Sequence, residues 1–450
     1  MADFERLAEA TVTSVMKLGA DACDVLVADS RFTSAEIEKG SMKQSSQVTD
    51  PGVGVRAFKN GCSGFAFCTG HDVKVVRRIA ERAVALSRAG TPDPDFKSLP
   101  EKTRPARVQG LFDRRVADLE SDDVVSMAIS LSDVAGDDKR IRSVNAGVTV
   151  GQGLFALANS NGFASSQKMT SFDVSAEAVA GDGSEMFSGV DAAASRKLKT
   201  DLIERVGGNA RAHAVLGLRG TKIETGDYPV VLDPLAAAFI LGTAIGGGVN
   251  AESIQRKRSY LTGRLGKKIG SDMLTIYDDP TLEWASGSYS FDGEGIAASR
   301  KTVVNRGKLM TYLYDSLAAD KDSRKSTGNA SRGGAIWSFR RIPSISPSNL
   351  VVRKGDSGSE EMIRETRTGV YLRLTYDYPN LATGEFSGLM MESFRIDRGE
   401  IGPSIRQATI GVHLLDMFSR MDMIGKNSVD VFGVRTPPLR VSKARIGGSS

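Results

Sequence analysis

Two alternating stretches of similar length constrain the fold more than any other part of the chain. Residues 141–158 and 163–180 alternate between apolar and polar side chains and meet at NSNG, Asn159–Gly162. A period of two is typical of strands with one buried face, and Asn-Gly favours a tight hairpin turn. Helical periodicity precedes this pair after Asp122 and follows it from Thr200 to Leu218. The sequence therefore predicts a long hairpin with a helix on each side.

A similar order of elements is predicted near the start of the chain. Apolar residues over 4–16 mark one face of a helix, and strands follow from Cys23 toward Asp50. A hairpin over 53–68 turns at Lys59-Asn60-Gly61, and Asp72 caps a second helix. These elements form an α-β-β-α layer. The order resembles that of residues 122–218, so we expect a pseudo-repeat.

A proline-rich connector separates the two rounds, at residues 92–105. We therefore expect an N-terminal α+β domain over residues 1–220, with sub-segments at about 1–90 and 119–220. The remainder, 221–450, is strand-rich and predicts a mainly antiparallel β domain. The predicted class is α+β, with an α/β layered N-terminal region.

Composition and charge exclude several classes of protein. The three cysteines are an odd number and too few for a disulfide framework, which favours a cytoplasmic protein. No signal peptide or membrane span is predicted. The net charge of +5 over 450 residues is small, so nucleic acid is not an expected partner. Basic residues concentrate only in the tail, 435–445, which we interpret as a solvated terminal strand.

Residues 231–250, VLDPLAAAFILGTAIGGGVN, predict a buried helix. Asp233 is a good N-cap, Pro234 suits the first helical position, and the glycines Gly246–Gly248 end the pattern. A catalytic zinc needs about three ligands from His, Glu, Asp or Cys. After Asp233 this stretch has none of them until Glu252. The helix itself therefore offers no zinc site.

Several strings along the chain resemble the TldD/PmbA family of modular peptidases, on its PmbA/TldE side. They are DPGVGVRAFKNGCSGFAF at 50–67, NSNG at 159–162, DDP at 278–280, FDGEG at 291–295, STGNASRGG at 326–334 and GEIGPSIRQATIG at 399–411. TldD-type chains of this family carry His-Glu-x-x-x-His on the helix equivalent to residues 231–250, and a distant Cys. Here Gly242 and Thr243 stand at the His-Glu pair, Gly247 at the second His, and residues 429–436 contain no Cys.

The resemblance implies a subunit of a TldD/TldE-type metalloprotease that acts on extended or unfolded peptides. This chain would be its non-catalytic, TldE/PmbA-like member, without a cofactor of its own. Its partner would be a TldD-like chain that holds the zinc, or a second copy of itself. One alternative is a metallopeptidase in its own right, with a divergent site assembled from distant residues. A further alternative, a regulator related to DNA gyrase, has no support from the charge pattern.

Candidate functional side chains outside that helix are few. His71, His213 and His413 are far apart in sequence and have no neighbouring Cys or His, so we interpret them as ordinary core or surface residues. The acidic strings DDP and FDGEG fit turn chemistry better than a cation site. The segment STGNASRGG combines polar side chains with glycines, as a peptide-binding edge does. Its candidate peptide contacts are Thr327, Asn329, Ser331 and Arg332.

Overall fold

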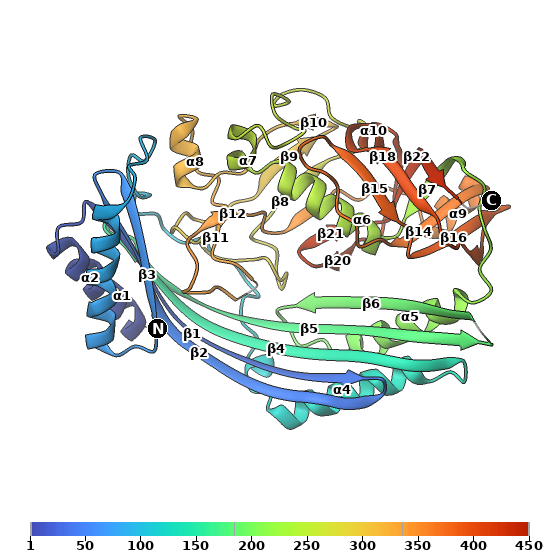
Figure 1. Cartoon of the computed structure of the whole chain (residues 1–450), viewed down its shortest axis with the longest axis horizontal. Coiled ribbons are helices and arrows are strands. Elements are labelled where there is room, and N and C mark those ends of the chain that lie inside the picture. Colours follow the sequence, from blue (N-terminus) through green and yellow to red (C-terminus); the bar gives the residue numbers. More distant parts are fainter. Residues whose placement is uncertain (1, 184, 335, 449–450) are drawn as a thin grey trace.

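One six-stranded antiparallel sheet forms the centre of the N-terminal half. The structure is a computed structural model that describes residues 2–183, 185–334 and 336–448. The strand order is β3-β2-β1-β4-β5-β6, and the long strands bend together across the molecule (Figure 1). The strands are β1 (Ala22–Glu38), β2 (Ser41–Lys59), β3 (Cys62–Thr69), β4 (Ile141–Asn159), β5 (Ala164–Asp182) and β6 (Glu185–Ser195).

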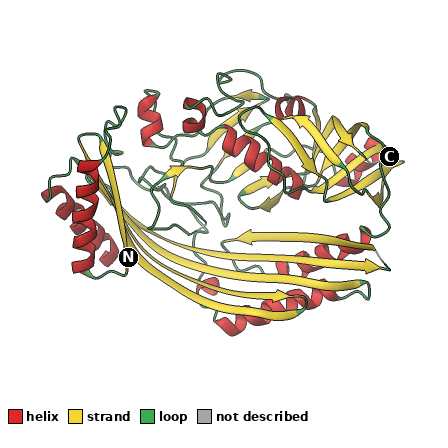
Figure 2. Ribbon diagram, viewed as in Figure 1, coloured by secondary structure: helices red, strands yellow, loops and turns green. Residues whose placement is uncertain are grey.

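Helices cover one face of this sheet in two groups (Figure 2). They are α1 (Ala2–Lys17), α2 (Val73–Ala89), α3 (Arg114–Ala117), α4 (Ser121–Gly136) and α5 (Asp201–Leu216). Val25 and Val27 of β1 pack against α1 and α2, whereas Ala146 and Val148 of β4 pack in the cluster that holds α4 and α5. Because side chains alternate along a strand, the other set of residues faces the C-terminal half.

The pseudo-repeat is present, with one more strand in each round than the sequence predicts. The order α1-β1-β2-β3-α2 is matched by α4-β4-β5-β6-α5. The α-β-β-α layer was therefore wrong by one strand. Strand β6, EMFSGVDAAAS, was missed because its small residues have low strand propensity. Gly64 in β3 and Gly189 in β6 hold equivalent positions, since the backbones of α2 and α5 approach them closely.

The C-terminal half contains two main sheets with the helix α6 (Pro234–Leu241) between them. The larger sheet comprises β7 (Gly226–Leu232), β14 (Thr368–Leu374), β15 (Glu385–Leu389), β16 (Glu392–Asp397), β17 (Glu400–Ser404), β18 (Thr409–His413), β19 (Met421–Ile424) and β22 (Leu439–Gly447). The second comprises β8 (Ile276–Asp278), β9 (Lys301–Asn305), β10 (Lys308–Leu309), β13 (Leu350–Val352), β20 (Val429–Val431) and β21 (Val434–Thr436). A small pair, β11 (Ala330–Ser331) and β12 (Ser344–Ile345), stands apart.

The remaining helices of this half are short. They are η1 (Gly242–Gly247), α7 (Ala251–Gln255), α8 (Ser316–Lys321), α9 (Ser359–Thr366) and α10 (Leu414–Ser419). Most strand pairs are antiparallel, but β7 with β14 and β13 with β21 run parallel. The α+β class is therefore confirmed. Among the described residues, no helix combines the length and the apolar character that a membrane crossing requires.

The basic tail has a different place from the one predicted. Strand β22 is not a solvated terminal strand, because it pairs with β7 and β18 inside the larger sheet. Its cations meet carboxylates: Arg440 pairs with Asp422 at 2.9 Å, and Lys443 with Asp227 at 3.1 Å. The tail is therefore part of the core sheet of the C-terminal half.

A shared apolar cluster joins the two halves. Leu26 of β1 and Phe155 and Leu157 of β4 lie on the face of the sheet opposite the helices, and they pack against Phe291 and Trp337. All five side chains are at least 95% buried. Farther along the strands the same face becomes polar. The two halves therefore pack against each other at one end of the sheet. At the other end the polar face of the sheet lines a cleft between the halves.

Candidate functional site

The helix predicted within residues 231–250 forms with the expected cap and begins at Pro234. The Asp233 carboxylate accepts a hydrogen bond from the backbone N–H of Leu235 at 2.9 Å, and Pro234 takes the first position. Beyond Leu241 the helix widens into the π-helical turn η1. Such turns are rare and occur often at functional sites. Here the turn coincides with Gly242, Thr243 and Gly247.

The face that carries these three residues is partly exposed, whereas its neighbours are buried. A Cβ atom at Gly247 would lie 2.6 Å from Cδ1 of Leu381, so that side chain fills the space a longer residue would need. No group of three or more His, Cys, Asp or Glu able to hold a metal ion occurs among the described residues. Gly242, Thr243 and Gly247 do not fit a zinc ion, since they supply no ligand atom and little room.

Three aromatic side chains lie beside this face of the helix. Phe239 is one turn before Gly242 and contacts Tyr376 edge-on, with ring centroids 5.8 Å apart. Its ring also lies 5.8 Å from that of Phe432. Tyr376 is 46% exposed and Phe432 is 60% exposed. These two rings therefore reach from the helix toward solvent.

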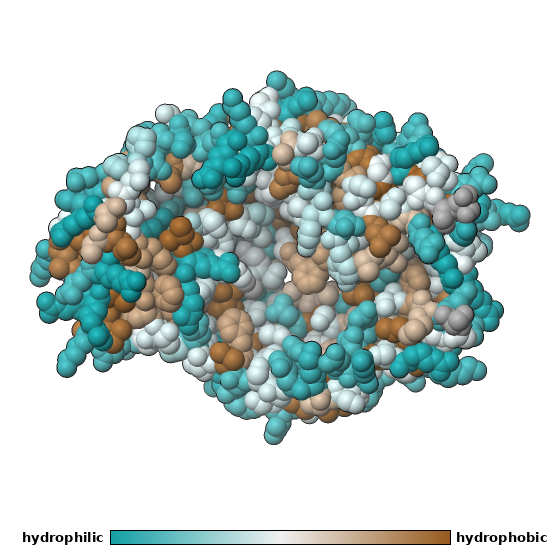
Figure 3. Space-filling model, viewed as in Figure 1, coloured by the Kyte–Doolittle hydropathy of each residue, from teal (hydrophilic) through white to brown (hydrophobic). Residues whose placement is uncertain are grey.

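Tyr376 and Phe432 line a cleft between the N-terminal sheet and the C-terminal half. One cavity of this cleft, which we call the central cavity, has a volume of about 670 Å³. It adjoins a second cavity of about 330 Å³ through Asp173 and Phe432, and a third of about 690 Å³ through Glu177 and Tyr376. Figure 3 shows the surface hollowed between the two halves. The three cavities therefore adjoin one another along the cleft.

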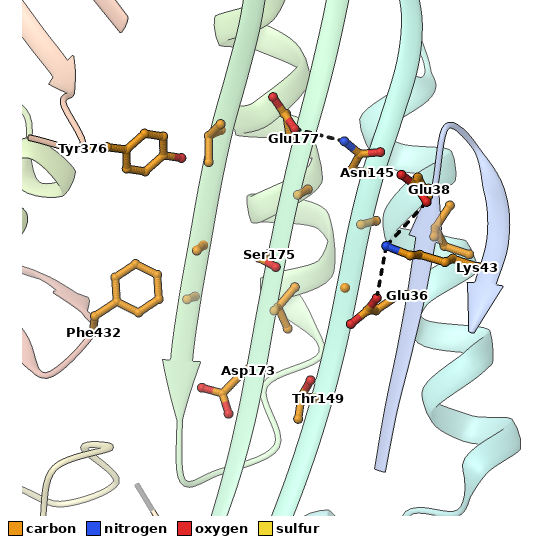
Figure 4. Close-up of a pocket in the computed structure, with 18 residues that line it drawn as sticks. Glu36, Glu38, Lys43, Asn145, Thr149, Asp173, Ser175, Glu177, Tyr376 and Phe432 are labelled. Carbon is orange, nitrogen blue, oxygen red and sulfur yellow. Dashed lines mark hydrogen bonds and ion pairs between the residues drawn. The ribbon is translucent and has the colours of Figure 1, made fainter. Parts of the chain in front are cut away.

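The sheet side of the central cavity is acidic. The strands present Glu36, Glu38, Asp173 and Glu177, with Lys43 as their one basic neighbour in the lining (Figure 4). Because Lys43 lies 3.5 Å from Glu38 and 4.0 Å from Glu36, it offsets these two. Glu177 accepts a hydrogen bond from the neutral amide of Asn145, and the charge of Arg196 acts on Asp173. The cleft is therefore negative in a chain whose net charge is +5.

Asp173 is the most desolvated of these carboxylates. Burial raises its pKa from 3.8 to about 6, and the Ser171 hydroxyl and the Arg196 guanidinium oppose that shift. Arg196 directs its own hydrogen bonds to the backbone oxygens of Thr170 at 3.0 Å and Ser288 at 2.8 Å. Burial therefore outweighs the effect of Ser171 and Arg196 on the pKa of this carboxyl.

We expect Asp173→Asn to raise the free energy of unfolding above pH 6 by about 2 kcal/mol. The full shift in the pKa of Asp173 corresponds to about 3 kcal/mol, and we reduce this value because solvent partly screens the carboxylate. At pH 4 the carboxyl is protonated in the folded chain and only about half ionised in the unfolded chain, so the variant gains little there. Between these limits the unfolded chain ionises first, and the parent loses stability as the pH rises. Urea unfolding of both proteins at pH 4 and pH 7.5 measures this. An equal difference at the two pH values would contradict it.

The four candidate peptide contacts separate into different environments. Asn329 is 1% exposed and donates to Asp278 at 2.8 Å, while its own oxygen accepts from Thr327 at 2.8 Å. Arg332 is 0% exposed. Asn329 and Arg332 are thus interior scaffold residues, which is a correction to the predicted role. Only Ser331 lines a cavity, the second one of the cleft.

Arg332 belongs to a buried ion cluster that spans the two halves. Its guanidinium donates to Asp24 of β1 at 2.5 Å and to the backbone oxygen of Gly293 at 2.9 Å. Arg56 of β2 also pairs with Asp24 at 2.5 Å, and with Glu294 at 3.0 Å. The strings GVGVRAF, FDGEG and STGNASRGG therefore meet here. Their shared role is to fix the position of one half against the other.

A second buried pair joins the halves next to the helix. Glu392 accepts from the backbone N–H of Val190 in β6 at 2.6 Å and from Arg373 at 2.6 Å. Burial raises the pKa of Glu392 to about 7, and Arg373 opposes this shift. Arg373 lies 3.7 Å from Asp233, and the Tyr371 hydroxyl donates to the same carboxylate at 2.5 Å. The cap of the helix and the edge of the sheet are thereby tied together.

The three histidines are not brought together. His71 contacts the backbone oxygen of Ala28 at 2.9 Å, and His413 caps α10. His213 lies in α5, where burial lowers its pKa to about 3. The sequence did not single out Asp173, Glu177, Tyr376 or Phe432. In the sequence, the polar residues that alternate with apolar ones over residues 141–180 were the one indication of this face. Such a pattern is the same whether the polar face lines a cleft or is open to solvent.

The fold and this helix define a peptidase family. The chain matches the PmbA/TldA metallopeptidase domain 1 over residues 23–87, the central domain over 114–218 and the C-terminal domain over 225–448. The chain belongs to the PmbA/TldD family.

Individual relatives agree over almost the full length. A metalloprotease of Methanothermobacter thermautotrophicus is 27% identical over 459 residues, which cover 95% of each chain. A putative modulator of DNA gyrase from Bacteroides thetaiotaomicron has a TM-score of 0.89 at 25% identity, over 100% of both chains. TldE from Thermococcus kodakarensis has a TM-score of 0.89 at 20% identity, over 98% of this chain and 99% of that one, so the fold is shared.

Proposed function

We propose that this chain is the non-catalytic, TldE/PmbA-like subunit of a TldD/TldE-type metalloprotease. The observation that carries the proposal is the helix that ends in η1. It keeps the cap, the burial and the partly exposed face, but Gly242, Thr243 and Gly247 bring no metal ligand and Leu381 fills the space beside Gly247. Hydrolysis would then belong to a TldD-like partner, whose zinc activates the water.

The contribution of this chain is to hold an extended peptide in the cleft. The three adjoining cavities, the exposed rings of Tyr376 and Phe432 and the polar face of the sheet support this role. Free thiols at Cys23, Cys62 and Cys68 agree with a reducing cytoplasm. A duplex nucleic acid is a poor occupant, because the carboxylates of the cleft repel phosphate.

Reconstitution tests the proposal. The chain alone should not hydrolyse an unfolded peptide, whereas the chain together with a TldD-like subunit from the same source should do so, and a chelator should abolish that activity. Replacing both Tyr376 and Phe432 by Ala should raise KM about tenfold and change kcat less than about twofold. Tyr378→Ala is the matched control, because this ring is 68% exposed but lines none of the three cavities. Peptidase activity of the isolated chain, or a double variant with unchanged KM, would refute the proposal.

A further inference from the structure

Asp173 occupies a depression in the floor of the cleft. Its neighbours in register are Thr149 of β4 and Ala194 of β6, and Ser171 and Ser175 stand two residues away on the same face of β5. All four side chains are small. Figure 4 shows the Asp173 carboxylate beside the end of β6. A long side chain can therefore reach it from above.

The same carboxylate lines both the central cavity and the second cavity. In the second cavity it is the one acidic residue among the described lining residues, and Arg196 is the one cation beside it. The rest of the lining is uncharged and includes Ser331, Trp337 and Phe432. An aromatic wall and a desolvated carboxylate together favour a cation on a flexible apolar stem. A neutral or acidic side chain would leave the carboxylate with Arg196 alone to offset its charge.

We propose that Asp173 anchors a lysine or arginine side chain of the bound peptide, so that the cleft selects peptides with a basic residue. This inference rests on the proposed function and adds a specificity to it. Asp173 is the better anchor than Glu177, because Glu177 already accepts a hydrogen bond from Asn145 at 3.0 Å. A divalent cation fits less well, since no group of three or more metal-binding side chains gathers within the described part of the chain.

Binding of two matched peptides tests the proposal. The probes are acetylated, extended Ala/Ser peptides that carry either one lysine or one norleucine, which has a similar stem without the charge. With the chain in its subunit complex, the lysine peptide should bind about tenfold more tightly. Asp173→Asn should remove the difference between the two affinities, chiefly by weakening the binding of the lysine peptide. Glu81→Gln is the control, because this carboxylate of α2 pairs with Arg77 at the surface and lines none of the three cavities, and both affinities should stay within about twofold.

The pH provides a second readout. The pKa of Asp173 is about 6, and Arg196 is the charged group that acts on it, while Glu36, Lys43 and Glu177 share its cavity. The affinity for the lysine peptide should fall between pH 7.5 and pH 5 as the carboxyl takes up its proton, whereas the norleucine affinity should not follow this curve.

The outcomes separate the two proposals. If both peptides bind equally, the basic specificity is wrong and the peptide cleft stands. If the lysine preference survives in Asp173→Asn, the anchor is another residue and this inference fails. If neither peptide binds to the complex, the proposed function fails, and the specificity fails with it.

Discussion

Arg332→Met should lower the free energy of unfolding by about 4 kcal/mol. The side chain is 0% exposed, and its guanidinium donates to three acceptors: the carboxylate of Asp24 and the backbone oxygens of Gly293 and Arg341. Removing the positive charge leaves buried carboxylates with Arg56 as their remaining cation, and a buried uncompensated charge is costly. Arg332→Lys should restore only part of the lost stability. A lysine ammonium lacks the planar set of N–H donors with which the guanidinium binds all three acceptors at once.

Urea unfolding followed by tryptophan fluorescence measures this effect, since Trp337 lies in the apolar cluster between the halves. The matched control is Arg77→Ala, which removes a surface pair with Glu81 whose arginine side chain is 77% exposed. We expect that control to change stability by less than about 0.5 kcal/mol. Equal losses in the two variants would show that the buried cluster does not hold the halves together.

Gly189→Ala should destabilise the chain by about 3 kcal/mol. The new Cβ would lie 2.2 Å from the backbone oxygen of Ala210 and 2.3 Å from the backbone nitrogen of Ala214. Both are atoms of the α5 backbone, so the clash cannot be relieved by turning a side chain, and the helix has to move away from β6. The equivalent substitution Gly64→Ala should act in the same way on α2, because the Ala83 oxygen is 2.2 Å from its Cβ position.

Gly208→Ala is the control for this pair. It lies on the same helix, has nothing within 4 Å of its Cβ position, and should gain up to about 1 kcal/mol from helix propensity. Thermal melts followed by circular dichroism compare the three variants, and Gly189→Ala should melt roughly 3 °C below the parent. A melting temperature equal to that of the parent would mean that α5 does not pack this closely on β6.

Most elements of the N-terminal half could be predicted from the sequence because the patterns that indicate them are local. The Asp72 and Asp233 caps, the NSNG turn and the period-two pattern of residues 141–180 depend on neighbours along the chain, and each corresponds to an observed element. Strand β6 gave no such signal, since its residues are small and its place is set by β5 and α5. The short strands of the C-terminal half were missed individually for the same reason.

The candidate site was harder to predict because its environment is made by distant parts of the chain. Arg332 looked available for a ligand, but Asp24, its partner, is 308 residues away in sequence. Asp173 and Glu177 looked like ordinary solvent-facing residues of a strand, and only the position of Tyr376 and Phe432 across the cavity gives them a different setting. By contrast, the lack of ligands at Gly242, Thr243 and Gly247 was visible at once, since it is a property of the residues themselves.

The metal content of the isolated chain tests the central claim most directly. The chain would be produced with ample zinc, purified without a chelator, and analysed for bound metal and for hydrolysis of an unfolded peptide. We predict no stoichiometric zinc and no hydrolysis, with both appearing only when a TldD-like subunit is added. One tightly held zinc per chain, together with a peptidase activity that a chelator removes, would contradict the account.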